Sequence, residues 1–522
     1  MKELIHRGIY IPKYNLVGLI IRFRGKKIEL NETTEQMAIQ FVKKFDTDYI
    51  KDKVFVNNFL EDFARELGIK GKVKLEDFDF SEIQKYLEEV KEKTEAMSKE
   101  EKKLARELKK QIREKLKEKY GYALVDGKKV PIMNWTVEIP SIFLSKGKNP
   151  LRGHWKRAIK REDITLNLSK VPKDLEKGWK EIVWEPNSLW IAKWKNPLDG
   201  KMKYVWFSPS SELRQSRAKK KWDKAIELDK KINKIEKLIE KAIRSSDIER
   251  KKLGCVVYLM YKLGVRVGDE KIAGERGTLG CTTLKKENVK LENGTLKLDF
   301  IGKDYVRWIR ELKLPREIYK VFKELYNNTK RNEFIFKGID SNKVSKFLRE
   351  AVPGISAKTF RTWLAGKTFK KGTKECKIPR DSEKLKKLSF QEVNLKVAKK
   401  LNHKRKIPSS YERGLLRKQE RLEKRKKKLK ELEIKLASEK NPKKRKKLKE
   451  RIKKQEVKVT EAYYEVKLHE ELKDWNLNTS KNSYIDPRLV KEFCEKENID
   501  ITKIYSKSLR EKFSWALKED NT

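Results

Sequence analysis

Leucines at intervals of seven mark the segment that most constrains the fold of this chain. The first series is Leu415, Leu422, Leu429 and Leu436, and a second series, with a spacing of four and three, is Leu448, Ile452, Gln455 and Val459. Asn441-Pro442 separates the two series, and proline cannot continue a helix. A narrow apolar seam on each of two consecutive helices lets them pack on each other. The sequence therefore predicts an antiparallel coiled-coil hairpin over residues 407–473 that projects from the body of the protein.

The chain carries a large excess of positive charge. It contains 131 Lys and Arg against 78 Asp and Glu, which gives a formal net charge of +53. Such a field attracts polyanions, and DNA or RNA is the first candidate. The alternative is a solvated, lysine-rich surface, but in heat-adapted proteins glutamate usually balances the lysine. No such balance exists here, so we expect a nucleic-acid partner.

Composition also excludes several classes of protein. Hydrophobic residues make up 37% of the chain, with 12 Trp and 20 Phe, which is enough to build cores. The four Cys are far apart, no CxxC occurs and only four His exist, so neither a zinc site nor a disulfide framework is expected, and a reducing intracellular compartment fits. The apolar stretches "NLVGLII" and "GCVVYLMY" are too short to span a bilayer, and the N-terminus lacks a signal-peptide core. We expect no metal, no cofactor and no membrane partner.

Changes in composition divide the chain into four parts. Residues 1–210 mix short strands and helices and include the basic loop "SIFLSKGKNPLRGHWKRAIKRED". Residues 211–406 are more apolar. The predicted hairpin, 407–473, follows, and residues 474–522 form a terminal piece rich in aromatic residues. This organisation predicts an α+β protein with more than one domain.

The second part has clear helix and strand signals. "LGCVVYLMYKLG" predicts a buried helix that ends near Gly264, and "NVKLENGTLKLDFIGKDYVRWIREL" predicts consecutive strands. The turn at "GKD" places Lys303 at the tip of a hairpin. "SAKTFRTWLAG" predicts a helix that starts at Ser356 and carries Arg361 in its early turns, and "SFQEVNLKVAKKLNHK" predicts an amphipathic helix that ends at His403.

Chemistry on a phosphodiester without a metal would need cations and hydrogen-bond donors around the phosphate. Arginine suits this best, because its planar fork binds two oxygens and keeps its proton. A tyrosine hydroxyl can be the nucleophile, but its ordinary pKa of ~10 requires a strongly cationic pocket. Tyr484, in "SKNSYIDPRLV", is one of 17 tyrosines, most of which we expect to be packing residues.

Five motifs single out Tyr484. "KLGVRVGDEK", "FIGKDYVRW", "AKTFRTW", "KKLNHKR" and "TSKNSYIDP" occur in this order. Together they resemble the eukaryotic-type DNA topoisomerase IB family, and the similarity extends over nearly the whole chain. The resemblance implies a bilobed DNA clamp. It would consist of a mixed α/β cap lobe (1–210), a mostly helical, tyrosine-recombinase-like catalytic core (211–406), a coiled-coil linker (407–473) and a C-terminal domain with the nucleophile (474–522).

The resemblance also implies an activity and its residues. The family relaxes supercoiled duplex DNA through a 3′-phosphotyrosyl intermediate, strand rotation and religation, without ATP or metal. Tyr484 would be the nucleophile, Arg266 and Arg361 would bind the non-bridging oxygens, and Lys303 would protonate the leaving 5′-oxygen. His403 would donate to the same phosphate, and its place near a helix C-terminus predicts a cationic imidazole.

Double-stranded DNA is the partner that the resemblance implies, bound by a monomer. Positions that match DNA-contacting stretches of the family are Lys203, Tyr204, Val267, Gly268, Asp269, Glu270, Lys271, Ser356, Ala357 and Lys358, and further matching positions are Lys146, Lys156, Lys224, Thr278, Asp304 and Thr479. For each of these lysines, an ordinary surface residue is the alternative interpretation.

The sequence departs from the family pattern at two positions. Ser483 stands where the family usually has Asn, and Lys146 where its basic loop has Arg; both put sensitivity to camptothecin-type poisons in doubt. The long charged N-terminal extension of many nuclear members does not precede the first motifs. This predicts a compact member, as in some archaea, located in the cytoplasm or nucleoid of a prokaryote or in the nucleus of a eukaryote.

Two other functions compete with this interpretation. Tyrosine site-specific recombinases share the catalytic layout, but they typically carry His three residues before the second arginine, where this chain has Lys358, and they lack the long hairpin. A non-catalytic basic scaffold for nucleic acid would explain the charge and the leucine repeat, but not five catalytic positions in order.

Overall fold

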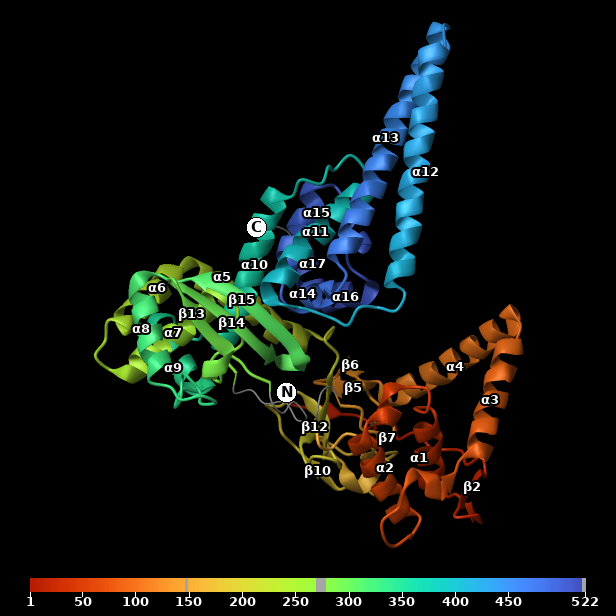
Figure 1. The fold of residues 1–522 in the computed structure, drawn as a ribbon. Coiled ribbons are helices and arrows are strands. Elements are labelled where there is room, and N and C mark those ends of the chain that lie inside the picture. The colour runs from red at the N-terminus through yellow and green to blue at the C-terminus, as the bar shows by residue number, and fades with distance from the viewer. Residues whose placement is uncertain (146–148, 269–277, 519–522) are drawn as a thin grey trace. The chain divides into compact units, whose positions relative to one another are not determined.

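The computed structural model describes residues 1–145, 149–268 and 278–518 (Figure 1). Contacts divide the chain into two compact units: the first ends at Arg214, and the second begins at Gln215 and includes the C-terminus. Each unit is described by itself. Helices and strands occur in both, so the α+β prediction is confirmed at this level. Within the described residues, no helix is both long and apolar enough to cross a membrane.

The first unit is built on a seven-stranded, mostly antiparallel sheet. Its order is β1-β5-β6-β12-β11-β9-β10, and only β9 and β10 pair in parallel. The strands are β1 (Leu4–Ile5), β5 (Tyr122–Val125), β6 (Lys128–Met133), β9 (Thr165–Asn167), β10 (Glu181–Val183), β11 (Trp190–Lys195) and β12 (Met202–Phe207). Val205 and Phe207 of β12 alternate with exposed residues and are buried in one core with Trp194 of β11, as expected for strands with one covered face.

A second core of the first unit is rich in phenylalanine. Phe41, Phe59 and Phe63 stack in it, with 3.9 Å between the ring centres of Phe41 and Phe59. The helices around it are α1 (Glu32–Val42), α2 (Lys53–Glu66) and α3 (Ser81–Ala96); the strands are β2 (Ile20–Phe23), β3 (Lys26–Glu29), β4 (Phe78–Asp79), β7 (Ser141–Ile142) and β8 (Trp155–Lys156). The remaining helix, α4 (Lys99–Tyr120), packs against β5 at the first core instead. The predicted basic loop, residues 141–163, contains both β7 and β8, which pair antiparallel, so part of it is a short two-stranded sheet.

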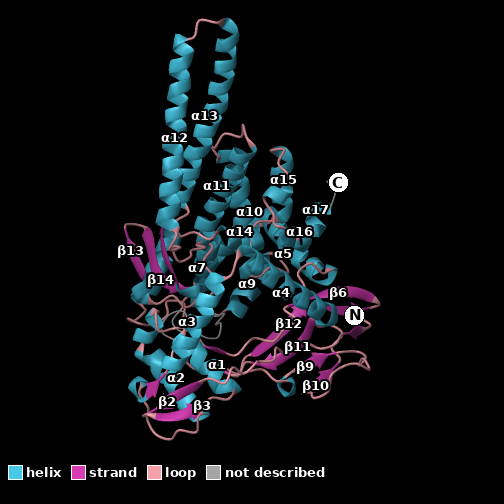
Figure 2. Cartoon of the chain, turned by 90° about the vertical axis from the view of Figure 1, so that its right-hand side faces the viewer, coloured by secondary structure: helices cyan, strands magenta, loops and turns pink. Residues whose placement is uncertain are grey.

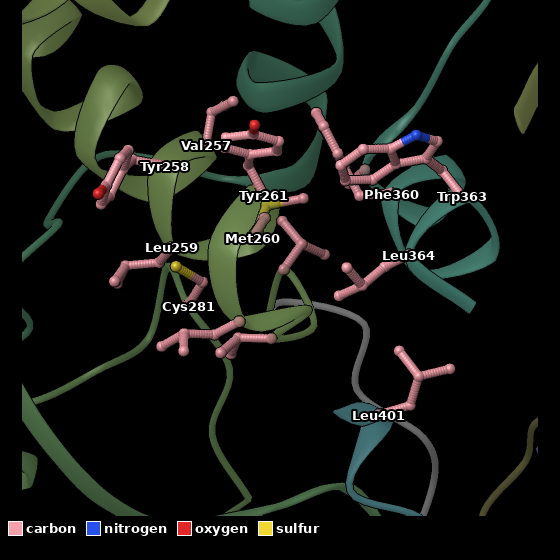
Figure 3. Close-up of a cluster of buried hydrophobic side chains, with 14 of the residues drawn as sticks. Val257, Tyr258, Leu259, Met260, Tyr261, Cys281, Phe360, Trp363, Leu364 and Leu401 are labelled. Atoms are coloured by element: carbon pink, nitrogen blue, oxygen red, sulfur yellow. The ribbon is translucent and has the colours of Figure 1, made fainter. Parts of the chain in front are cut away.

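The second unit is mostly helical. Its helices outside the long hairpin are α5 (Glu212–Lys230, which begins in the first unit), α6 (Ile232–Ile243), α7 (Ile248–Leu263), α8 (Arg316–Asn327), α9 (Ser341–Ala351), α10 (Ala357–Glu375), α11 (Glu383–Leu401), α14 (Leu477–Ser483), α15 (Pro487–Lys496), α16 (Lys507–Lys512) and α17 (Ser514–Lys518). Figure 3 shows part of its core, where Met260 and Tyr261 of α7 lie near Trp363 and Leu364 of α10. The rings of Tyr261 and Trp363 stack at 5.5 Å.

Local signals in the second unit are confirmed. α7 ends at Gly264, whose φ of 69° favours glycine, and Ser356 is the N-cap of α10. The strands β13 (Val289–Glu292), β14 (Thr295–Gly302) and β15 (Val306–Lys313) form an antiparallel sheet. Leu296, Leu298 and Phe300 point into the core from one face of β14. The β14–β15 turn carries Lys303.

The leucine repeat forms two long helices, α12 (Tyr411–Ser438) and α13 (Pro442–Glu471), joined at Asn441. They lie side by side in both views and extend beyond the other helices of their unit (Figures 1 and 2). Of the predicted leucines of α12, Leu422 is buried and the other three are half-buried, while Leu432, outside the predicted series, is also buried. The leucines are only partly buried because each helix of a two-helix hairpin covers just one side of the other, and solvent reaches the edges of the seam.

Candidate active site

Four of the five predicted catalytic side chains line one cavity of the second unit. The cavity has a volume of about 620 Å³, and its walls include Arg266, Lys303, Arg361 and Tyr484. The fifth side chain, His403, lies beside it, with its ring centre 4.9 Å from that of Tyr484. Residues separated by more than 200 positions in the sequence are thereby brought together. Across the ranges that the structure describes, no three His, Cys, Asp or Glu side chains form a metal-binding group.

Arg361 is held by the ends of two other helices. It projects from the second turn of α10, is 4% exposed, and donates from Nη1 to the carbonyl oxygen of Gly264 (2.5 Å) and from Nη2 to that of Leu401 (3.0 Å). Its Cζ lies 5.2 Å from the ring centre of Tyr484. Burial and the neighbouring Arg266 lower the pKa of Arg361 to about 10, against the opposing effect of Tyr484. With this pKa the guanidinium stays charged at neutral pH, and its bonds to the two carbonyl oxygens fix its position.

Arg266 is positioned by a close approach of two backbone segments. Its carbonyl oxygen accepts from the N–H of Cys281 (2.8 Å), and that of Val267 accepts from Thr282 (2.7 Å). The two segments can approach because Gly268 and Gly280 meet: a Cβ on Gly280 would lie 2.3 Å from the Cα of Gly268. Gly268 also has a φ of 126°, which side chains rarely tolerate. Glycine at both positions therefore fixes the backbone that carries Arg266.

His403 is neutral, so the prediction of a cationic imidazole is wrong. Burial and the charges of Arg361 and Arg266 lower its pKa to about 3. Its Nε2 lies 3.3 Å from Nη2 of Arg361, and its Nδ1 lies 3.1 Å from Oγ of Ser480. Since arginine can only donate, Nε2 accepts in this arrangement and Nδ1 carries the proton, donating to Ser480.

Tyr484 follows the last residue of α14, and its backbone N–H donates to the carbonyl oxygen of Ser480 at 2.9 Å. Burial alone would raise the pKa of its phenol. The charges of Arg361, Arg266 and Lys221 and a hydrogen bond from Arg361 oppose burial, and together they lower the pKa to about 8. The pocket therefore favours the phenolate, which is the nucleophilic form.

Lys303 stands on a constrained turn. The two residues that follow it, Asp304 and Tyr305, have φ values of 64° and 55°. This left-handed conformation is uncommon for side-chain-bearing residues and rare for an aromatic one. The turn bends sharply enough to pair Gly302 with Val306, and Lys303 lines the cavity.

The predicted DNA contacts of the first unit lie on its sheet and basic loop. Tyr204 of β12 is 41% exposed. Lys203 and Lys156 share one partner, since their Nζ atoms lie 3.4 Å and 2.6 Å from the carboxylate of Glu138; these two cations lower the pKa of Glu138 against the effect of its burial. Lys146 lies outside the described residues.

The predicted contacts of the second unit divide into three groups. Those that line the cavity are Lys224, Ser356 and Lys358. Val267 and Ala357 have buried side chains, so contacts there would use backbone atoms. Gly268, Thr278, Asp304 and Thr479 are partly or fully exposed, and Asp269, Glu270 and Lys271 lie outside the described residues.

Sequence reasoning missed the residues that support the catalytic set. Ser480 is fully buried, bonds the ring of His403 and accepts from the backbone of Tyr484. Asn402, in the left-handed conformation after α11, donates to the carbonyl oxygen of Arg307 on β15 (3.1 Å). Arg310 donates to the carbonyl oxygen of Lys399 (2.7 Å). The motif "LNH" contains one of these residues, but the sequence does not indicate what it would contact.

This arrangement defines a class of site. A tyrosine with a lowered pKa faces two fixed guanidinium groups, a neutral imidazole and a lysine in one cavity. Such a set can deliver an oxygen nucleophile to a phosphodiester and stabilise the added negative charge.

Comparison with known proteins gives the same class. Residues 1–207 match the family described as eukaryotic DNA topoisomerase I, DNA binding fragment; residues 210–436 match its catalytic core, and 449–522 match the C-terminal topoisomerase domain. DNA topoisomerase 1 of Homo sapiens is 30% identical over 550 residues, which cover 99% of this chain and 70% of the human protein. The chain belongs to the eukaryotic-type DNA topoisomerase I family.

Two further relatives are much longer than this chain. DNA topoisomerase 1 of Drosophila melanogaster is 31% identical over 532 residues, and DNA topoisomerase 1 alpha of Arabidopsis thaliana is 34% identical over 538 residues. The alignments cover 98% of this chain in both cases, but 54% of the fly protein and 58% of the plant protein. The chain thus spans less than two thirds of the length of these relatives.

Proposed function

We propose that the protein is an ATP-independent type IB DNA topoisomerase, an isomerase that relaxes supercoiled duplex DNA. It cleaves one strand, holds the end as a 3′-phosphotyrosine, lets the DNA rotate and religates the strand. Family membership supports the class of reaction, and the cavity of the second unit supports the assignment of its residues.

Cleavage begins with attack of the phenolate oxygen, Oη of Tyr484, on the phosphorus of one strand. A bond forms between this oxygen and phosphorus, and the bond from phosphorus to the 5′-oxygen breaks. Arg266 and Arg361 bind the non-bridging oxygens, whose negative charge grows as the phosphorus becomes pentacoordinate. Lys303 gives a proton to the leaving 5′-oxygen, and religation is the reverse of these steps.

His403 takes part as a neutral hydrogen-bond donor. In the DNA-free structure its Nε2 accepts from Arg361. When a phosphate takes this donor, Nε2 can present a proton to the phosphate only if Nδ1 becomes an acceptor. The hydroxyl of Ser480 permits the exchange, because a serine can either accept from or donate to an imidazole nitrogen.

The architecture of the proposed enzyme follows the family pattern. The first unit is the cap lobe of a clamp, the second holds the catalytic core and the C-terminal domain, and α12–α13 is the coiled-coil linker. The protein acts as a monomer on double-stranded DNA and needs no metal or cofactor. The exposed Tyr204 of the first unit and the basic residues of the cavity are its proposed contacts with DNA.

One observation carries the proposal: Tyr484 lines one cavity with Arg266, Lys303 and Arg361, whose Cζ lies 5.2 Å from the tyrosine ring centre. The surrounding cations outweigh burial, which disfavours a phenolate. A structural tyrosine has no need of such surroundings, and a strongly perturbed titratable group in a cavity indicates function. Tyr505, which is fully buried in the same unit, shows the ordinary case, since its pKa is raised.

Relaxation of a supercoiled plasmid tests the proposal. The wild-type protein is expected to relax the plasmid in EDTA without ATP, and Tyr484→Phe is expected to leave it supercoiled. Relaxation by both proteins would contradict the assignment of the nucleophile. Binding of DNA by both, with relaxation by neither, would favour the scaffold function.

A further inference from the structure

Two neighbouring residues of α5 hold the two carbonyl groups next to the nucleophile. The ammonium group of Lys221 donates to the carbonyl oxygen of Ser483. Nε1 of Trp222 donates to the carbonyl oxygen of Tyr484 at 3.2 Å. Residues 221 and 483 are 262 positions apart, and neither of these contacts was expected from the sequence.

These carbonyl groups are the ones that a short helix leaves without partners. α14 ends at Ser483, and Tyr484 leaves the helix with φ −124° and ψ −45°. The last carbonyl oxygens of a helix have no donor within the helix. α5 supplies the missing donors from outside and thereby fixes the direction in which the chain leaves α14 at Tyr484.

Other contacts of α5 hold the segment that follows Tyr484, residues 488–514. The amide nitrogen of Gln215 donates to the carbonyl oxygen of Glu511 (2.8 Å) and to Oγ of Ser514 (2.9 Å). Asp223 accepts from Arg488 at 2.9 Å. The ring of Trp222 packs edge-on against Phe513 at 5.7 Å. The segment after the long hairpin is thus docked along one side of α5.

Lys221 also places a charge on the nucleophile. Its Nζ lies 4.5 Å from the ring centre of Trp222 and 5.3 Å from that of Tyr484. Burial and the neighbouring Lys512 lower the pKa of Lys221 to about 8, against the opposing effects of Tyr484 and Asp486. The titratable phenol therefore faces Arg361, Arg266 and Lys221, with Lys512 and Asp486 beyond the ammonium group.

We propose that Lys221 and Trp222 are positioning residues of the cleavage reaction: together they hold the backbone of Tyr484, and Lys221 also stabilises its phenolate. The inference rests on the proposed function. It goes further by assigning two separable roles to one helix, an electrostatic role to Lys221 and a purely geometric role to Trp222.

A simpler explanation is that Lys221 only binds a DNA phosphate, as its place in a basic cavity would allow. The two explanations differ in what they predict for pH. A phosphate contact changes DNA affinity and its dependence on salt. A charge beside the nucleophile changes the pH at which the cleavage rate levels off.

The test uses the full chain and a partial duplex whose cleaved fragment is too short to stay paired, so that the covalent adduct accumulates in a single turnover. Lys221→Met removes the charge, Lys221→Arg keeps it, and Trp222→Phe removes only the N–H donor. Lys230→Met, at an exposed position in the last turn of the same helix, is the matched control. Adduct formation is followed across a range of pH, and DNA affinity is measured separately on a Tyr484→Phe background.

We expect Lys221→Met to form the adduct about tenfold more slowly near neutral pH and to level off at a pH about one unit higher, since each pKa unit changes the phenolate fraction tenfold below the pKa. Lys221→Arg should keep the wild-type inflection. Trp222→Phe should be slower at every pH, with no shift of the inflection. Lys230→Met should match the wild type.

Two results would overturn the inference while leaving the proposed function intact. The first is a Lys221→Met profile that superimposes on that of the wild type. The second is a loss of cleavage that is matched by the loss of DNA affinity, which would make Lys221 a DNA contact only. A wild-type protein that forms no adduct would instead overturn the proposed function, and this inference with it.

Discussion

The α12–α13 hairpin and the active-site cavity are both dominated by positive charge, but they hold it in different ways. Residues 415–454 contain 20 Lys or Arg against 6 Glu, and most of these cations are exposed. In the cavity, Arg361 is 4% exposed and bound by two carbonyl oxygens. The hairpin has many interchangeable charges, whereas the cavity has a few fixed ones.

The difference shows why the amount of charge predicts the partner but not the chemistry. Exposed cations act through the long-range field, which salt screens. Buried cations act at short range on one group, and only they shift pKa values strongly. Tyr463 of the hairpin is 49% exposed, whereas Tyr484 lies among the cations that lower its pKa to about 8.

The largest expected effect comes from the two tyrosines. Tyr484→Phe should abolish covalent adduct formation, because the protein then lacks the attacking oxygen. Tyr463→Phe should form the adduct at the wild-type rate. Adducts are counted on a denaturing gel with end-labelled DNA. An adduct that survives in Tyr484→Phe would show that the cavity does not hold the nucleophile.

The next effect compares two arginines. Arg361→Lys keeps a charge but loses the planar fork that bonds Gly264, Leu401 and the phosphate, so cleavage should slow by about a hundredfold or more. Arg425→Lys in the hairpin, where the guanidinium reaches the carbonyl oxygen of Lys458 at 2.6 Å, should change the rate by less than about twofold. Single-turnover cleavage measures both, and equal effects would remove the distinction between fixed and interchangeable charge.

A third prediction concerns pH. Because the pKa of Tyr484 is lowered to about 8, the cleavage rate should rise about tenfold per pH unit up to this value and then level off. His403, with a pKa of about 3, should add no inflection near its ordinary value. The rate is measured in a single turnover from acid to alkaline buffers. An inflection near the ordinary pKa of tyrosine, ~10, would mean that the buried cations do not activate it.

The smallest expected effect on cleavage comes from the distal hairpin. The change is to replace residues 426–453, which hold 14 Lys or Arg and 4 Glu, by a short loop. The base of α13 stays in place in this variant, because Glu461 and Glu465 bond Ser382 and Lys384 at the start of α11. Cleavage should change by no more than about threefold, while DNA affinity becomes less dependent on salt. More turns should be released per cleavage, because the basic hairpin would no longer slow rotation. Single-molecule steps of unchanged size would reject this role.

Much of the fold could be predicted where short-range patterns decide it. Gly264 ends α7, Ser356 begins α10 and the "GKD" turn carries Lys303, because caps and turns depend on a few adjacent residues. The seam of the hairpin was also visible, although Leu432 is buried and was not among the predicted leucines.

The environment of the site could not be predicted in the same way. The resemblance assigns His403 a role, but the charge of its imidazole depends on residues from other parts of the chain. Tyr484 packs against the ring, and burial and the charges of Arg361 and Arg266 lower its pKa. Ser480, Lys221 and Trp222 carry no motif of their own and matter only through what they touch. Local periodicity in the sequence does not predict long-range contacts of this kind.

The most direct test of the account is to identify the residue that becomes joined to DNA, and to which strand end. Trypsin cleavage after Lys481 and Arg488 yields the peptide Asn482–Arg488, whose only tyrosine is Tyr484. After nuclease treatment of the trapped adduct, mass spectrometry should find this peptide linked through Tyr484 to a nucleotide 3′-phosphate. A linkage through another residue, or to a 5′-phosphate, would contradict the assignment of the cavity as the site of cleavage.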